Sequence, residues 1–132
     1  MAPEKKVIDA SIIAKWFLEE EGSIKAIALR DAHISGSIVL VVPELAFIEV
    51  MNVLRYKKKS ILELQKVGLA LWNIQLQVEK LTEFVLLKSV QLAVKYKLSV
   101  YDGLYAFVSQ MHGSSLVTAD KALQKIPNAE IL

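Results

Sequence analysis

The stretch from residue 98 to residue 121, LSVYDGLYAFVSQMHGSSLVTADK, constrains the fold more than any other part of the chain. Its apolar segments predict a strand over 98–101, a helix ending near His112 and a return strand over 115–118. Two strands joined by a helix of this length are typical of neighbours in a parallel sheet. Asp102 and Asp120 would then follow strands about 4.8 Å apart, at the sheet edge where ligands bind.

Composition bounds the class of protein. The 132 residues are 54% hydrophobic and 23% charged, which excludes global disorder and predicts one domain spanning residues 1–132. No apolar run approaches the roughly 18 residues of a membrane span, the first residues, MAPEKK, do not resemble a signal peptide, and there is no cysteine. We therefore expect a cytoplasmic protein without membrane contact. The net charge of +2 permits a nucleic-acid partner without requiring one, and the surplus of apolar residues predicts an exposed apolar patch for a protein partner.

The rest of the chain alternates between short strands and helices, which favours an α/β fold around a small parallel sheet. The apolar patterns predict strands over 6–8, 38–42, 78–81 and 130–132, and helices over 23–33, 44–58, 60–72 and 83–96. The helix over 44–58 is apolar around most of its circumference, so we expect it to be buried on more than one side. In the helix over 83–96, the inward side chains are predicted to be Leu86 or Leu87, Val90, Ala93 and Val94.

Four acids occupy positions compatible with one pocket. Asp9, Asp102 and Asp120 follow apolar segments of strand length, and Glu49 lies within the apolar helix. Carboxylates gathered at strand ends repel one another, and a divalent cation such as Mg²⁺ would remove that conflict. Such a site suits metal-assisted hydrolysis of phosphate esters.

Each acid also has an ordinary structural explanation. The three aspartates could each cap a following helix, and Glu49 could pair with a nearby lysine. Tyr105 falls three residues after Asp102 on the same helix face, where core packing explains it equally well. The basic run at 55–59 offers a possible edge for phosphate groups, while serine-hydrolase, P-loop and zinc patterns are missing from the sequence. No single acid therefore indicates a metal-dependent hydrolase, and only the four acids together do.

Four segments in order, VIDASIIAKWF, PELAFIEVMNVL, YDGLYAFVSQ and LVTAD, resemble the motifs of PIN-domain proteins, specifically the VapC-like toxins of prokaryotic toxin–antitoxin pairs. The resemblance spans essentially the whole chain. It implies a three-layer α/β/α sandwich with a small central parallel sheet. It also implies an endoribonuclease that depends on Mg²⁺ or Mn²⁺.

The resemblance also implies roles for individual residues. The catalytic acids would be Asp9, Glu49, Asp102 and Asp120. Of these, Asp9 and Asp102 would bind the metal directly, Asp120 directly or through water, and Glu49 would position or activate the attacking water. The supporting polar residues would be Ser11, Asn52 and Thr118. Family members usually form homodimers and are inhibited by a VapB-like antitoxin. Gly103 departs from the family pattern, which more often has alanine there, and it is expected to loosen the helix start.

Other functions remain open at this point. A nuclease of this family could act in RNA maturation or quality control outside any toxin pair. A non-catalytic interaction domain could use the same acids to bind a basic peptide. A phosphoacceptor receiver domain has a similar size, but it needs an acidic pair after the first strand, where this chain has Asp9 followed by alanine and serine.

Overall fold

A computed structural model describes residues 2–57 and 59–132. The elements in chain order are β1 (Glu4–Ile8), α1 (Ala10–Ala14), α2 (Ser23–Ile34), β2 (Ile38–Pro43), α3 (Leu45–Tyr56), α4 (Ile61–Asn73), β3 (Gln77–Glu79), α5 (Glu83–Tyr96), α6 (Val100–Met111), β4 (Ser115–Thr118), the 3-10 helix η1 (Lys121–Lys125) and β5 (Ala129–Ile131). The predicted alternation of short strands and helices is confirmed.

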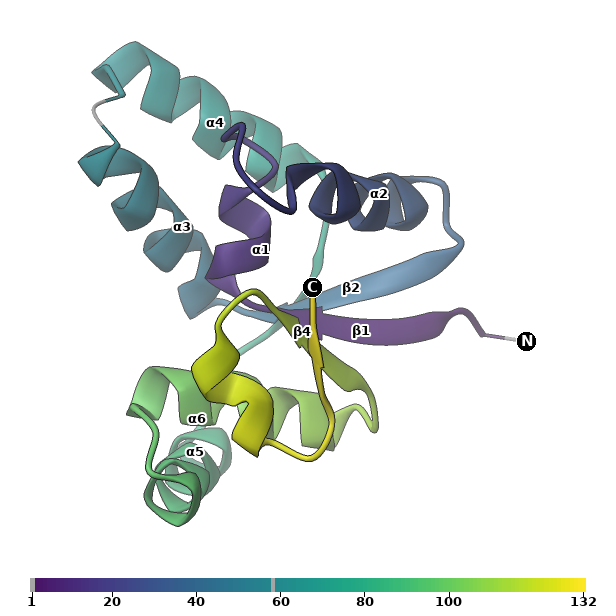
Figure 1. The fold of residues 1–132 in the computed structure, drawn as a ribbon, viewed down its shortest axis with the longest axis vertical. Coiled ribbons are helices and arrows are strands. Elements are labelled where there is room, and N and C mark those ends of the chain that lie inside the picture. The colour runs from purple at the N-terminus through teal and green to yellow at the C-terminus, as the bar shows by residue number, and fades with distance from the viewer. Residues whose placement is uncertain (1, 58) are drawn as a thin grey trace.

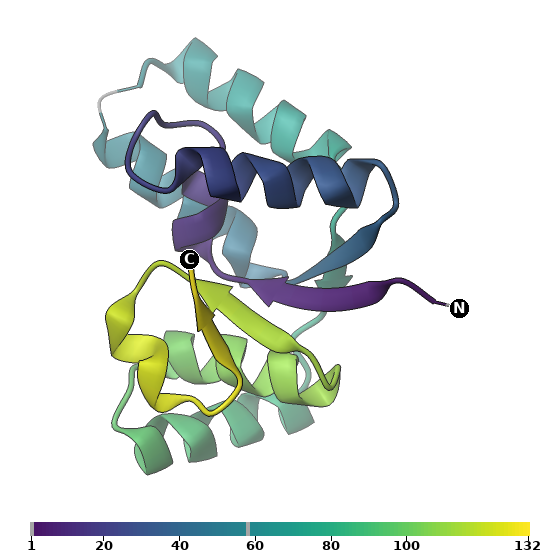
Figure 2. The same ribbon diagram turned by 45° about the vertical axis from the view of Figure 1, so that its right-hand side comes forward.

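The strands form one parallel sheet in the order β3-β2-β1-β4-β5. Helices α1 to α4 lie on one face of the sheet, and α5, α6 and η1 lie on the other (Figures 1 and 2). In the register of the central strands, Val7 pairs with Val41 on one side and with Leu116 on the other. The predicted α/β fold with three layers is therefore confirmed.

The three central strands form the middle of the core. Their buried side chains form nearly continuous apolar runs, as expected for strands covered on both faces. The residues that are at most 1% exposed there are Val7, Ile8, Leu40, Val41, Val42, Leu116 and Val117. Burial of these runs fixes the sheet and therefore fixes where each strand ends.

The strand predicted over 98–101 is wrong. Lys97 adopts a left-handed conformation that ends α5, and Ser99 then caps α6 by accepting a hydrogen bond from the Asp102 amide. Val100 and Tyr101 are 45% and 58% exposed, because they lie in the first turn of a helix and not in a buried strand. A four-residue apolar run is too short for periodicity to separate the two structures.

The predicted inward face of α5 is also wrong. In α5 the buried residues are Val85, Ser89 and Ala93, so of the predicted inward residues only Ala93 is buried, while Leu87 and Val94 are 60% and 75% exposed. In α3, for which burial on more than one side was predicted, the side chain of Ile48 is 68% exposed. The strongly apolar sequence therefore leaves large apolar side chains on the surface.

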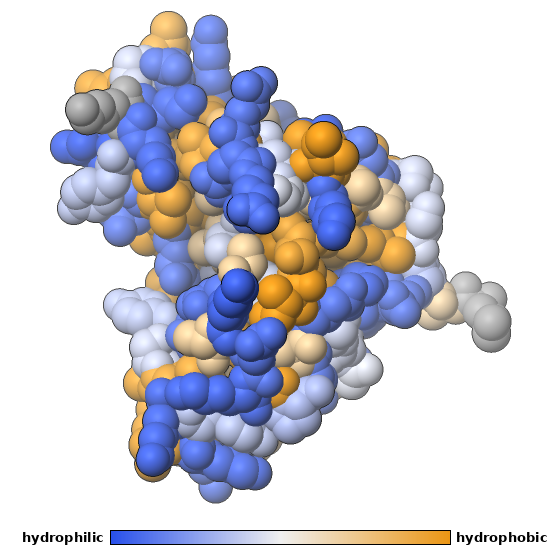
Figure 3. Space-filling view, viewed as in Figure 1, coloured by the Kyte–Doolittle hydropathy of each residue, from blue (hydrophilic) through white to orange (hydrophobic). Residues whose placement is uncertain are grey.

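Apolar side chains gather on the molecular surface. On the face drawn in Figure 3 they lie in the centre, between α2 and the C-terminal end of the chain. The exposed large apolar residues on other helices include Ile61 and Trp72 of α4, which are 77% and 70% exposed. Within residues 2–57 and 59–132, no helix is both long and apolar enough to cross a membrane. The exposed apolar surface agrees with the patch predicted from composition.

Gly103 lies where α5 and α6 come closest together. A Cβ atom at this position would lie 2.3 Å from the backbone oxygen of Ser89 and 3.0 Å from the Cβ atom of Ala93. Because the nearest obstacle is backbone, the two helices could not keep this spacing with a larger residue. Gly103 thus permits tight packing at the start of α6, and the expectation that it loosens the helix start is wrong.

Candidate active site

The order of the strands reverses at β1. The chain moves from β1 outward to β2 and β3, and then returns to place β4 on the opposite side of β1. In open parallel sheets, ligands bind at such a reversal, beyond the carboxyl ends of the strands. Asp9 follows β1 directly, and Asp120 lies two residues after the end of β4. Two of the predicted acids thus lie at this edge.

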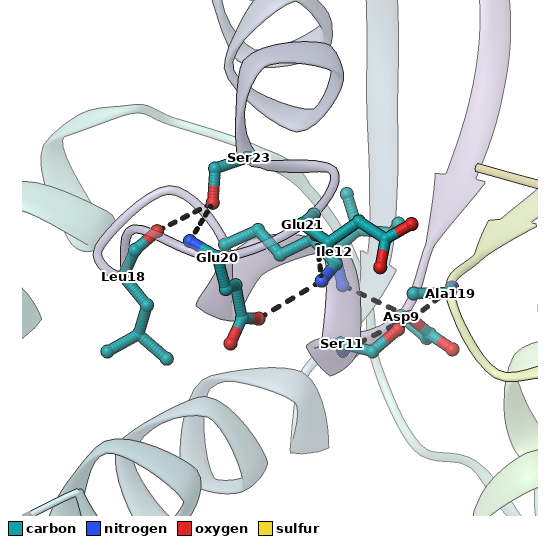
Figure 4. Close-up of polar contacts among 9 residues, drawn as sticks. Asp9, Ser11, Ile12, Leu18, Glu20, Glu21, Ser23 and Ala119 are labelled. Atoms are coloured by element: carbon teal, nitrogen blue, oxygen red, sulfur yellow. Dashed lines mark hydrogen bonds and ion pairs between the residues drawn. The ribbon is translucent and has the colours of Figure 1, made fainter.

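Asp9 is held by hydrogen bonds on both carboxylate oxygens. Its Oδ1 accepts from the Ser11 amide at 3.1 Å, from the Ser11 hydroxyl at 2.5 Å and from the Ile12 amide at 3.3 Å, which makes Asp9 the N-cap of α1. Its Oδ2 accepts from the Thr118 hydroxyl. The Ser11 hydroxyl oxygen in turn accepts from the Ala119 amide at 3.1 Å, and Figure 4 draws Asp9, Ser11 and Ala119 together. The ends of β1 and β4 are therefore joined through this carboxylate.

Burial opposes the charge on Asp9. The residue is only 6% exposed, and loss of hydration raises the pKa of its carboxyl group above the usual value. The hydrogen bonds from Ser11, Thr118 and Ile12 lower the pKa, but burial is the larger effect. An ionised Asp9 is thus well supplied with donors and still gains from a nearby cation.

Glu49 projects from α3 toward the same region. It is half-buried, and its Oε1 accepts a hydrogen bond of 2.8 Å from the hydroxyl of Tyr105 on α6. Burial raises the pKa of Glu49, the Tyr105 bond lowers it, and the charges of Asp9 and Asp102 raise it further. These mutual effects place Glu49 within electrostatic range of both aspartates.

Asp102 and Asp120 complete the acidic group. Asp102 lies in the first turn of α6, which Ser99 caps, so Asp102 is not the N-cap but does lie where the helix dipole favours an acid. Burial and then the charge of Asp120 raise the pKa of Asp102. Asp120 is exposed and caps η1 by accepting from the Ala122 amide at 2.9 Å. Its own amide donates to the Thr118 hydroxyl at 3.0 Å.

The predicted supporting residues fall into two groups. Ser11 and Thr118 both donate to Asp9. Asn52 is exposed on α3, and within the described residues it makes no hydrogen bond to an acid of the site. Of the basic run at 55–59, Arg55 and Lys57 are exposed at the end of α3, and Lys58 lies outside the described residues.

The four acids fit a hard divalent cation in donor chemistry. All supply carboxylate oxygens. The charges of Asp9 and Asp102 oppose ionisation of Glu49, and the charge of Asp120 opposes ionisation of Asp102, effects that a cation would reverse. In the described part of the chain, however, no three acidic or histidine side chains lie close enough together to form a metal site. The acids are therefore electrostatically coupled, without a formed coordination shell.

Tyr105 is the site residue that sequence reasoning left undecided. Its position three residues after Asp102 placed it on the correct helix face. That spacing alone could not show that its hydroxyl would meet a carboxylate from α3, because the contact joins residues 56 positions apart.

The PIN domain family matches the chain over residues 6–129, almost its full length. The chain belongs to the PIN domain family. A comparison with curated protein sequences finds no significant match.

Several solved structures share the fold of this PIN domain. Protein PAE2754 from Pyrobaculum aerophilum is 24% identical with a TM-score of 0.73, over 99% of this chain and 85% of that one. A toxin–antitoxin complex from Klebsiella pneumoniae is 19% identical with a TM-score of 0.73, over 95% of each chain. VapC20 of Mycobacterium tuberculosis, a toxin that cleaves the sarcin–ricin loop, is 16% identical with a TM-score of 0.67, over 86% of this chain and 87% of that one. At these identities the likeness establishes the shared fold.

Proposed function

We propose that this PIN domain is an endoribonuclease that depends on Mg²⁺ or Mn²⁺ and acts as the VapC-like toxin of a type II toxin–antitoxin pair. The observation that supports the proposal is the electrostatic link among acids from separate segments: the charges of Asp9 and Asp102 act on Glu49, and that of Asp120 acts on Asp102. Burial raises the pKa of Asp9, Glu49 and Asp102, and neighbouring carboxylates raise it further at Glu49 and Asp102, which is the electrostatic setting of a cation site.

Each acid has a role in this proposal. Asp9, Asp102 and Asp120 would hold the metal, with Ser11 and Thr118 orienting Asp9 through their hydroxyl groups. Glu49 would orient the attacking water and accept its proton. When bound, the ion would supply a Lewis acid that activates water and offsets charge developing on the phosphate. Asn52, exposed one turn after Glu49, would support the site from its rim.

The proposed substrate is RNA. The exposed side chains of Arg55 and Lys57, at the end of the helix that carries Glu49, would contact the RNA backbone and make binding depend on salt. The toxin role draws support from the shared fold with toxins of known toxin–antitoxin complexes. A VapB-like antitoxin is therefore the proposed inhibitor.

A homodimer is the proposed assembly. Its support is the large amount of exposed apolar surface, including Trp72 at 70% and Leu87 at 60%. Size-exclusion chromatography with light scattering would measure the mass directly, and a monomer at all concentrations would contradict the proposal.

Cleavage of a fluorescent single-stranded RNA by the purified protein tests the activity. We expect cleavage with Mn²⁺ or Mg²⁺, none with EDTA, and a loss of at least about 100-fold in Asp9→Asn, because the substitution removes the most buried carboxylate charge of the site. Asp31→Asn is the matched control, since Asp31 is an exposed residue of α2 paired with Arg30. Equal cleavage by wild type with metal, wild type with EDTA and Asp9→Asn would rule out the mechanism.

Among the described residues no three acidic or histidine side chains are grouped closely enough to hold a metal, which favours a second candidate. This candidate is a non-catalytic domain that binds a basic peptide through the same acids. That candidate predicts partner binding that survives EDTA and loss of any single acid. A third candidate, an RNA-processing nuclease outside a toxin pair, predicts the same cleavage but no antitoxin gene beside this one.

A further inference from the structure

Tyr105 combines deep burial with a polar contact inside the acidic site. Its side chain is only 2% exposed, in the middle of α6, where Leu104, Ala106 and Val108 are also buried. A buried hydroxyl group needs a hydrogen-bond partner to offset its lost hydration. Its side-chain partner is the carboxylate of Glu49 at 2.8 Å. Phenylalanine would serve a purely apolar role equally well, so the hydroxyl requires its own explanation.

The direction of this hydrogen bond is fixed. Burial and the charge of Glu49 raise the pKa of Tyr105 far above its usual value. The charge of Asp9 acts in the same direction. The hydroxyl therefore stays protonated and donates a hydrogen bond to Glu49. In this structure Tyr105 therefore occupies one oxygen of Glu49 and leaves the other oxygen for another partner.

The bond joins two helices that carry different acids. Glu49 comes from α3, on one face of the sheet, whereas Asp102 and Tyr105 come from α6, on the other (Figure 1). A half-buried glutamate has three side-chain torsions and reaches solvent easily unless a contact restrains it. In the described residues, the Tyr105 hydroxyl is the one side-chain hydrogen-bond partner of Glu49. The restraint therefore comes from the helix that also places Asp102.

We propose that Tyr105 is a positioning residue, whose hydroxyl holds one carboxylate oxygen of Glu49 so that the other faces Asp9 and Asp102. The proposal rests on the function proposed above, because Glu49 matters for cleavage only if the acids act together. Residues that orient a catalytic carboxylate typically contribute about 10- to 100-fold to activity or metal affinity.

Tyr105→Phe tests the proposal because it removes the hydroxyl and keeps the ring. We expect the cleavage rate at saturating Mn²⁺ to fall about 10- to 100-fold, with an unchanged midpoint of RNA binding. Tyr101→Phe is the matched control, since Tyr101 lies on the same helix and is 58% exposed. Wild-type cleavage by Tyr105→Phe would overturn the proposal.

A double-mutant cycle separates positioning from general packing. If Tyr105 acts through Glu49, then Tyr105→Phe changes the residual cleavage of Glu49→Gln by less than about twofold, because the carboxylate that it orients is already gone. A merely structural role predicts the same fold-loss in both backgrounds. Equal losses would therefore reject the positioning role.

A third measurement is independent of activity. Crystal structures of the metal-free wild type and Tyr105→Phe should show that Glu49 leaves its position only in the variant. An unmoved Glu49 would overturn the inference even if the variant is slow. Should the wild type fail to cleave RNA with any divalent metal, the proposed function fails, while the two crystal structures still decide the positioning of Glu49.

Discussion

Asp9 and Glu49 carry carboxylates of the same candidate site, but the chain secures them in different ways. Asp9 follows a central strand and accepts hydrogen bonds from residues two and three positions later and from Thr118 on the neighbouring strand. Glu49 sits on a helix, and among the residues that the structure describes its carboxylate has one side-chain partner, Tyr105, from a helix on the opposite face. The first carboxylate is fixed by strand register and local capping, and the second by the packing of distant helices.

This difference separates stability from activity in the two halves of the site. Disturbing the Asp9 half breaks contacts that join β1 to β4 in the core, so the free energy of unfolding should change. Removing the Tyr105 hydroxyl disturbs one side-chain contact, to the half-buried Glu49, so cleavage should change with less effect on unfolding. The Tyr105→Phe experiment probes the Glu49 half, and the substitutions below test the contrast further.

The largest expected effect comes from Gly103, which sets the position of the helix half. Gly103→Leu should lower the free energy of unfolding by about 3 kcal/mol or more, because its side chain would meet the backbone of Ser89. Urea denaturation followed by circular dichroism measures this. Gly68→Ala is the control, since its Cβ would lie 3.9 Å from Met51 in ordinary contact, and it should stabilise α4 by about 0.5–1 kcal/mol. Similar stabilities for the two variants would contradict the close packing of α5 and α6.

An intermediate effect is expected for Thr118→Val, which keeps the shape of the side chain but removes the hydroxyl. The buried Oδ2 of Asp9 then loses its donor, so the free energy of unfolding should fall by about 1–3 kcal/mol. Thr118→Ser should restore most of this loss. A Thr118→Val protein as stable as wild type would show that the Asp9 half does not depend on the contact between strands.

The smallest effect concerns the pH dependence of the metal-free protein. Because burial raises the pKa of Asp9 above its unfolded value near 3.8, the folded state binds its proton more tightly than the unfolded state. The stabilisation from protonated Asp9 is complete below the unfolded pKa and is lost as pH rises through the folded pKa. Between pH 4 and pH 7 in EDTA, the melting temperature of wild type should therefore fall relative to that of Asp9→Asn, by a few degrees. If the melting temperatures of wild type and Asp9→Asn change with pH in the same way across this range, then ionising the buried Asp9 does not destabilise the folded state.

Much of the architecture was predictable from local pattern. The strand before Asp9 and the helices predicted over 60–72 and 83–96 agree with the structure, because each depends on a pattern of residues close together in the chain. The strand predicted over 98–101 was wrong because local pattern has a limit. Four apolar residues carry too little periodicity to separate a strand from the start of a helix. The prediction of inward residues in α5 failed because hydrophobicity alone does not show which face a helix turns toward its neighbour.

The candidate site shows the same division. The contact between Ser11 and Asp9 could be predicted locally, because the two residues are two positions apart. The contact between Thr118 and Asp9 follows from the register of β1 and β4 once the sheet is known. Asp102 lies in the first turn of α6, within electrostatic range of Asp120, although the strand predicted before it does not exist. Asn52 fitted the motif but is exposed in the structure.

The sequence by itself determined the α/β class and the parallel sheet, because short-range patterns of apolar and polar residues encode these features. Only the tertiary structure decided that Tyr105 meets Glu49 and that Gly103 lies against the backbone of Ser89. Both contacts depend on the spacing of helices that are far apart in the chain, and that spacing results from the packing of the whole core.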